Sequence, residues 1–180
     1  MIELWPAIPL FIAAIMASVT RGSLRAIIML AAPLISAYAI FQLEPGTVFS
    51  VELMGLQLTP VRIDALSILF GYLFNLAALI GVIYALHVKD PMQDLAALAY
   101  AGSAVGAVLA GDLLTLFVYW ELLALTSVFL IFARRTERAY KAGMRYLLIQ
   151  ISSGLLLLSG AIFYSSAGNG LSFNYIGLES

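Results

Sequence analysis

One acidic side chain, Glu121, stands inside a long apolar stretch of the chain. Between Asp112 and Arg134 there is no other Asp, Glu, Lys or Arg. A carboxyl in such surroundings is expected to hold its proton at neutral pH, because a low dielectric disfavours the charged form, and to release it when a cation approaches. Glu121 is therefore a candidate proton-binding site whose occupancy a neighbouring charge can set.

The composition shows what kind of element must position this acid. Of 180 residues, 63% are apolar and 11% are charged, whereas a soluble domain carries roughly a quarter charged residues. This excludes a soluble globular domain, and it excludes disorder, which requires low hydrophobicity. A formal net charge of −1 leaves no basic face for nucleic acid. The chain is therefore expected to be an integral membrane protein.

Long unbroken apolar runs predict helices that cross the bilayer, because about 20 apolar residues span its hydrocarbon core. We predict an all-α, single membrane domain over residues 1–180 with six transmembrane helices. The expected spans are residues 4–20, 24–41, 66–86, 92–110, 113–132 and 144–164.

Between the second and third spans the pattern changes from continuous to alternating. Residues 48–53 and 56–59 alternate around Met54-Gly55, which predicts a short β-hairpin. Because strand edges need water or protein partners, the hairpin is expected outside the hydrocarbon. The polar run at residues 165–170 is expected to be a loop.

The distribution of basic residues predicts the orientation. Basic residues in short loops favour the cytoplasm, and only Arg62 falls on the even-numbered side. Both termini are therefore expected outside, with the odd-numbered loops in the cytoplasm. The basic residues of the odd-numbered connections are Arg21, Arg25, Lys89, Arg134, Arg135, Arg138 and Lys141.

Glu121 is expected near the middle of its span. Eight residues of the span precede it and eleven follow, which places it roughly 12 Å from one edge and 16 Å from the other. Ionisable residues at that depth are rare and are functional candidates by default. The alternative is a protonated glutamate that makes one interhelical hydrogen bond and serves packing alone.

Four residues of the last span are candidates for a polar path near Glu121. Gln150 and Ser153 are three residues apart and share a helix face, with Ser152 beside them. These side chains could carry water, or they could be interhelical packing contacts. Arg145 could extend the path, although two residues into the span it is better placed to reach the cytoplasmic edge.

Other sequence features indicate packing and the absence of bound groups. Gly102 and Gly106 form a small-residue stripe suited to close helix packing. No nucleophile–base pair, phosphate-binding loop or cluster of metal ligands occurs, and the chain has one His and no Cys. We therefore expect no catalytic residue, no metal and no cofactor.

The chain resembles a known family. Residues 111–123, the basic connector 134–143 and residues 145–154 with their Ser-Ser-Gly ending are similar to the fifth and sixth helices of antiporter-like membrane subunits. That family comprises Mrp-type cation/proton antiporter subunits and the proton-pumping arm of respiratory complex I, and the sequence looks closest to the D-type subunit of the Mrp antiporters. The stretch Arg62–Ser67 entering the third span fits as well, and the resemblance extends over essentially the whole chain.

The resemblance implies a role for Glu121. In the family a fifth-helix glutamate pairs with a seventh-helix lysine and modulates proton movement along a midplane polar axis; Glu121 matches the glutamate, while the lysine has no counterpart in these 180 residues. Family subunits have about fourteen helices with inverted five-helix repeats, so the fold here is expected to be incomplete. The first repeat would open near residue 92. Ser180 looks like a truncation or a split-gene boundary, and a lone copy is not expected to complete a transport path.

Three hypotheses follow. The first is the amino-terminal part of a proton-translocating subunit of a multi-subunit Na⁺/H⁺ antiporter in a bacterial inner membrane, in contact with other subunits, lipid, protons and Na⁺. The second is a proton-pumping subunit of NADH:quinone oxidoreductase or a related membrane hydrogenase, without redox centres of its own; only then would the chain be part of an enzyme. The third is a structural membrane fragment in which Glu121 is silent.

Overall fold

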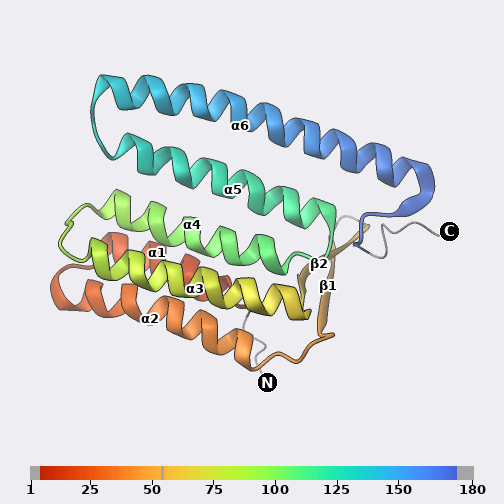
Figure 1. Ribbon diagram of the computed structural model, residues 1–180, viewed down its shortest axis with the longest axis horizontal. Helices are drawn as coiled ribbons and strands as arrows, with labels where there is room; N and C mark the ends of the chain where they lie inside the picture. Colours follow the sequence, from red (N-terminus) through yellow and green to blue (C-terminus); the bar gives the residue numbers. More distant parts are fainter. Residues whose placement is uncertain (1–4, 54, 174–180) are drawn as a thin grey trace.

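The computed structural model describes residues 5–53 and 55–173 as a bundle of α-helices with a two-stranded hairpin at one end (Figure 1). The helices are α1 (Ile8–Val19), α2 (Gly22–Phe41), α3 (Ala65–Ala85), α4 (Pro91–Leu109), α5 (Leu113–Phe132) and α6 (Glu137–Tyr164). The strands are β1 (Val48–Leu53) and β2 (Leu56–Arg62), and a π-helical turn, η1, covers Ser165–Asn169.

The helices do not share contacts equally. The central helix α4 packs against α1, α3 and α5, while α2 contacts α1 and α3. The last helix, α6, packs on α5 at the edge of the bundle (Figure 1). Helix α5, which carries Glu121, therefore lies between α4 and α6.

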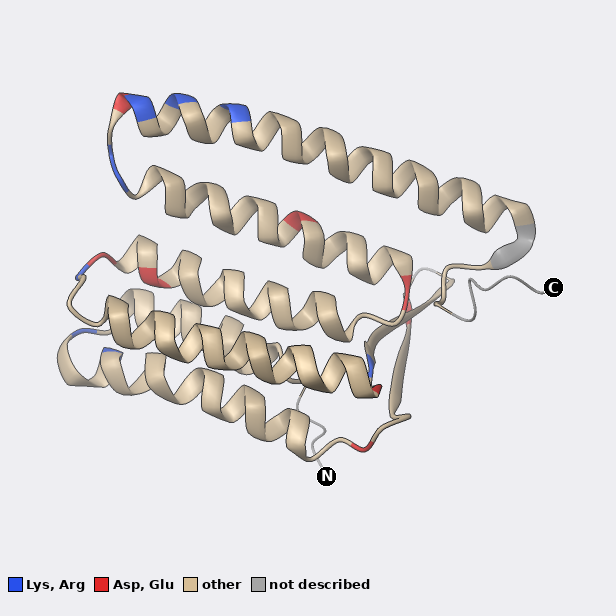
Figure 2. Ribbon diagram, viewed as in Figure 1, with Lys and Arg blue, Asp and Glu red and all other residues tan. Residues whose placement is uncertain are grey.

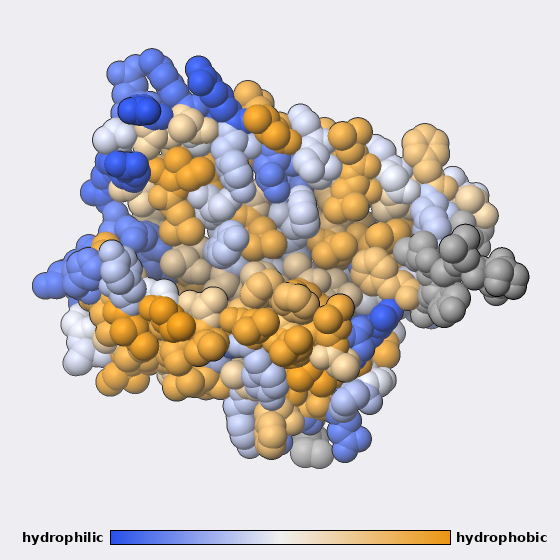
Figure 3. All heavy atoms as spheres, viewed as in Figure 1, coloured by the Kyte–Doolittle hydropathy of each residue, from blue (hydrophilic) through white to orange (hydrophobic). Residues whose placement is uncertain are grey.

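Five of the six helices, α2 to α6, are long and apolar enough to cross a membrane, and their presence agrees with the predicted spans. Helix α5 has the predicted bounds, and α2, α3 and α4 differ from prediction by one or two residues. Figure 3 shows apolar side chains over much of one face of the bundle, with hydrophilic side chains gathered at one end. The chain is therefore an integral membrane protein by composition and helix length.

The predicted first span, residues 4–20, is wrong in its length. Helix α1 has 12 residues, about 18 Å, which is shorter than a hydrocarbon core of about 30 Å. Two prolines, Pro6 and Pro9, delay its start, because proline lacks an N–H and fits only the first turn of a helix. Leu4, where the span was expected to begin, lies outside the described residues.

The last helix begins before the predicted start of the last span. Helix α6 begins at Glu137, seven residues before the expected Met144, because Thr136 caps it by accepting a hydrogen bond from the Ala139 N–H at 3.1 Å. The basic connector is therefore mostly helical, and Lys141 pairs with Glu137 one turn away at 2.7 Å. Hydropathy marks where a helix enters lipid, whereas capping and propensity decide where it begins.

The hairpin prediction is confirmed. Leu53 pairs with Leu56 across a two-residue turn that contains Gly55 at φ 81°, a conformation that glycine adopts at little cost. Strand β2 continues to Arg62, beyond the predicted end at Thr59. At residues 165–169 the expected loop is instead a π-helical turn that extends α6.

Charged residues separate between the two ends of the bundle. Figure 2 shows Lys and Arg gathered at the end that carries the α1–α2, α3–α4 and α5–α6 connections. Arg62, at the end of β2, lies at the hairpin end. At the connection end, Arg135 reaches Asp90 at 2.7 Å and ties the α5–α6 connection to the α3–α4 connection.

Candidate functional site

Glu121 lies in the seam between α5 and α6. It is the ninth residue of the 20-residue helix α5, its side chain is partly buried, and none of the ion pairs among the described residues includes it. Its Oε1 atom is buried and has no hydrogen-bond partner within the described ranges. Burying a polar atom without a hydrogen-bond partner costs free energy. Such an atom indicates either a strained packing contact or a group that binds a partner absent from the described residues.

The carboxyl of Glu121 points at the backbone of α6 beside Gly154. A Cβ atom placed on Gly154 would lie 2.7 Å from Glu121 Cδ and would overlap Oε1, closer than real Cβ contacts allow. Gly154 is itself buried. The glycine therefore leaves the space that the carboxyl occupies.

The other candidates on α6 lie at different distances from this contact. Gln150 is half-buried and one turn before Gly154, on the same helix face. Ser152 and Ser153 are exposed, and the Ser152 hydroxyl donates to the Leu148 carbonyl at 2.8 Å. Arg145 is exposed and nine residues from Gly154, about 13 Å along the helix. The geometry thus places Gln150 on the helix face of Gly154, and the polar path through all four residues stays a prediction.

The two glycines of the predicted stripe face different helices. A Cβ on Gly106 would meet the ring of Tyr119 on α5, with 2.6 Å to its Cδ1, whereas one on Gly102 would lie 3.2 Å from Leu10 Cβ on α1. Both glycines are buried. They let α4 approach its neighbours on two sides.

A buried ion pair that the sequence did not predict joins α2 to α4. Arg25 donates from Nε to Asp94 Oδ2 at 2.5 Å and from Nη2 to Oδ1 at 2.7 Å, while Nη2 also reaches the Val88 carbonyl at 2.5 Å. The Asp94 side chain is 2% exposed and that of Arg25 is 12% exposed. Both residues lie near helix ends on the same expected side of the membrane. Their opposite charges were the only signal in the sequence that the two could pair.

A second buried acid, Asp112, connects α5 to the hairpin. Its carboxylate caps α5 by accepting from the Thr115 N–H at 2.7 Å and hydroxyl at 2.6 Å, and it accepts from the Thr59 N–H at 2.6 Å. Asp112 is completely buried, and charge-assisted bonds of this kind offset the cost of burying it. The sequence pattern did not identify Asp112 as a structural residue, and nothing in the pattern indicated its bond to the hairpin.

At the start of α3, Asp64 forms a capping box outside the membrane-spanning segment. The Ser67 N–H, at 2.7 Å from Oδ1, is the main cause that lowers the pKa of Asp64 below its usual range, and the Ser67 side chain and the charge of Arg62 act in the same direction against a smaller effect of burial. Arg62 lies 3.4 Å from Asp64 and also donates to the Phe173 carbonyl at 2.9 Å. The hairpin end is thereby fastened by polar contacts.

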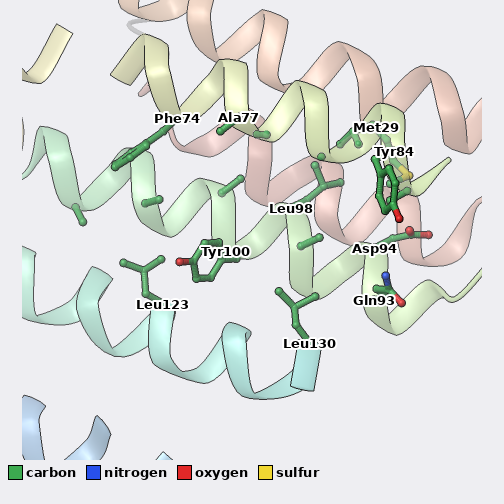
Figure 4. Close-up of a pocket in the computed structure, with 18 of the residues that line it drawn as sticks. Met29, Phe74, Ala77, Tyr84, Gln93, Asp94, Leu98, Tyr100, Leu123 and Leu130 are labelled. Atoms are coloured by element: carbon green, nitrogen blue, oxygen red, sulfur yellow. The ribbon is translucent and has the colours of Figure 1, made fainter. Parts of the chain in front are cut away.

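A large apolar groove of about 690 Å³ lies between α3, α4 and α5 (Figure 4). Figure 4 shows Phe74 and Ala77 at one part of it and the polar Tyr84, Gln93 and Asp94 at another. Glu121 does not line this groove. The unpartnered acid and this apolar groove are therefore separate features of α5.

Comparison with known proteins shows which membrane subunits the chain is similar to. Residues 110–179 match the family model described as "NADH:quinone oxidoreductase/Mrp antiporter, TM", a stretch that contains both Glu121 and Gly154. This chain is thus similar, over its last helices, to membrane subunits of antiporters and respiratory complexes.

Particular relatives agree with this class. The chain is 32% identical over 118 residues to the "Na(+)/H(+) antiporter subunit A1" of Staphylococcus haemolyticus (strain JCSC1435), a match that covers 62% of this chain and 15% of that protein. Because this relative is named as an A1 subunit, the expected likeness to the D-type subunit stays a prediction.

Two solved structures resemble the whole fold. An archaeal respiratory complex, the membrane-bound sulfane sulfur reductase, has a chain with a TM-score of 0.82 and 26% identity, covering 95% of this chain and 29% of that one. The Mrp complex from Dietzia sp. DQ12-45-1b has a chain with a TM-score of 0.75 and 26% identity, covering 92% of this chain and 20% of that one. The chain therefore spans less than a third of the length of these relatives.

Proposed function

We propose that this chain acts within a proton-translocating subunit of a multi-subunit monovalent cation/proton antiporter, and that Glu121 takes up and releases the transported proton. The observation that carries the proposal is the unpartnered Oε1 of an acid in the middle of a membrane-spanning helix. A fully paired acid would be held in one protonation state, whereas an unpaired one can respond to a charge brought by another segment.

The similarity to antiporter subunits supports this assignment, as does the separation of basic residues between the ends of the bundle. The proposal includes the expected orientation, with the basic end in the cytoplasm of a bacterial cell. It also includes an inverted repeat that opens near α4, other subunits as partners, and Na⁺ as the exchanged cation. Among the Mrp subunits, the D type is the one proposed.

One experiment tests the role of Glu121. In everted vesicles that contain the assembled complex, Glu121→Gln should lower Na⁺-dependent proton release by about 10²-fold, the size of effect typical of losing a proton-transfer group. Glu52→Gln is the matched control, because Glu52 is exposed on β1 and far from the seam. Normal antiport by a correctly assembled Glu121→Gln variant would refute the proposal.

A second candidate function is proton pumping in an electron-transfer complex. The TM-score of 0.82 with a chain of an archaeal respiratory complex favours it specifically. Proton release that follows addition of Na⁺ without any electron donor supports the antiporter. Proton movement that requires an electron donor and ignores Na⁺ supports the second candidate.

A further inference from the structure

We infer that Gly154 is a positioning residue for Glu121: its missing side chain forms a notch in α6 that holds the carboxyl inside the α5–α6 seam. The role of the carboxyl in proton transfer rests on the proposed function, while its placement by Gly154 can be tested separately.

The contact geometry carries the first step. The buried residues of α6 are all small: Ala139, Gly143, Gly154 and Ala161. At Gly143 the space left by the missing side chain is taken by the apolar ring of Phe132, whose Cδ1 would lie 3.0 Å from a Cβ. At Gly154 it is taken by a carboxyl. Of these two glycines, Gly154 is therefore the one where a missing side chain makes room for an ionisable group.

The cost of a glycine in this place supports the second step. Glycine in the interior of a helix is destabilising relative to alanine, and at residue 154 the close approach of the Glu121 carboxyl gives a physical reason for it. Gly160, also in the interior of α6, has nothing within 4 Å of its Cβ position. The two glycines thus provide a matched pair on one helix, one beside Glu121 and one facing open space.

The third step concerns what the notch does. With Gly154 in place, Oε1 is buried against the α6 backbone and shielded from water. An added methyl group at residue 154 would force the side chain of Glu121 into another rotamer or push α6 away from α5. The notch therefore fixes where a proton donor or a cation must come to reach the acid.

The test uses the full chain in membrane vesicles and an apolar carbodiimide, which labels protonated carboxyls within membranes. Gly154→Ala should raise the labelling rate of Glu121 several-fold, because the carboxyl leaves the notch. The rate is measured by mass spectrometry of the peptide that contains Glu121. Gly160→Ala should leave that rate unchanged. Equal labelling rates in Gly154→Ala and the unmodified chain would overturn the inference.

A double substitution covers the case in which Gly154→Ala prevents folding. If the clash with Glu121 is the cause, Glu121→Ala should restore assembly of the Gly154→Ala chain, because the added methyl group then meets no carboxyl. Equal loss of assembly in both backgrounds would overturn the inference. Normal antiport by Glu121→Gln would refute the proposed function without affecting either result, so the two failures are distinguishable.

Discussion

Asp94, which is buried, and Glu121, which is partly buried, lie in the same bundle in opposite electrostatic situations. Asp94 accepts two hydrogen bonds from Arg25, which link α2 to α4. Glu121 lies in the α5–α6 seam with one buried oxygen unpaired by any described residue. Asp94 therefore contributes an interhelical ion pair to the structure. Glu121 takes part in no ion pair among the described residues, and this difference separates a structural acid from the acid proposed to transfer protons.

Removing the partner of Asp94 should have the largest effect on stability. Arg25→Met leaves Asp94 buried without its partner, and loss of one member of a buried pair costs about 3–5 kcal/mol. We expect a large fall in the melting temperature of the detergent-solubilised chain and poor recovery from membranes. The double variant Arg25→Met/Asp94→Leu should recover much of the loss, because no buried charge is left unpaired. A single variant as stable as the unmodified chain would show that the pair is not structural.

Glu121 should show the opposite pattern. Glu121→Gln keeps the shape of the side chain and breaks no ion pair among the described residues. We therefore expect a melting temperature within the range of ordinary surface variants, about 0.5 kcal/mol or less in unfolding free energy, together with a loss of antiport. A strong destabilisation by Glu121→Gln would place Glu121 with Asp94 as a structural acid.

The capping acid Asp112 should have an intermediate effect. Asp112→Ala removes the acceptor for the Thr115 and Thr59 N–H groups. Loss of a helix cap costs about 1 kcal/mol, and an unsatisfied buried N–H adds about 1–3 kcal/mol. Thermal unfolding measures the loss, and Asp90→Ala, which removes a less buried cap on α4, is the comparison. Equal effects of the two variants would contradict a special role for the hairpin contact.

The smallest effect on stability is expected at Asp64, and it is measured as a dependence of unfolding on pH. Because the pKa of Asp64 is lowered in the folded protein, its contribution to stability is present above the pKa of the unfolded chain, about 3.9. That contribution is lost as pH falls through the lower folded value. The side chain is 48% exposed, so the effect is screened and small. Unfolding of Asp64→Asn should depend less on pH in this acidic range than unfolding of the unmodified chain.

Hydropathy and turn chemistry predicted most of the fold. The bounds of α5 follow from its apolar run between Asp112 and Arg134, and the hairpin turn follows from Gly55. The helix bounds differ from the predicted spans where capping mattered more than hydropathy. Prolines shortened α1, and Thr136 started α6 inside the basic connector.

The candidate site was only partly predictable. Glu121 can be identified as a candidate from the sequence however the helices pack. The free-energy cost of burying a carboxyl depends on its apolar surroundings rather than on one neighbour. Gly154 gave no signal of its own, since its importance depends on which α5 side chain lies opposite. The Arg25–Asp94 pair was missed for the same reason: the two residues are 69 positions apart, and each alone resembles an ordinary charge at a helix end.

By itself, the sequence determined that this protein lies in a membrane, that its chain is mostly helical, and that one acid sits deep within a helix. These properties depend on local composition and on the cost of transferring charge into lipid. The tertiary structure alone decided which buried acid is paired and which is not. Pairing requires atoms from distant segments to meet within hydrogen-bond distance. Helix packing brings Arg25 to Asp94, while it places the backbone of Gly154 beside Glu121.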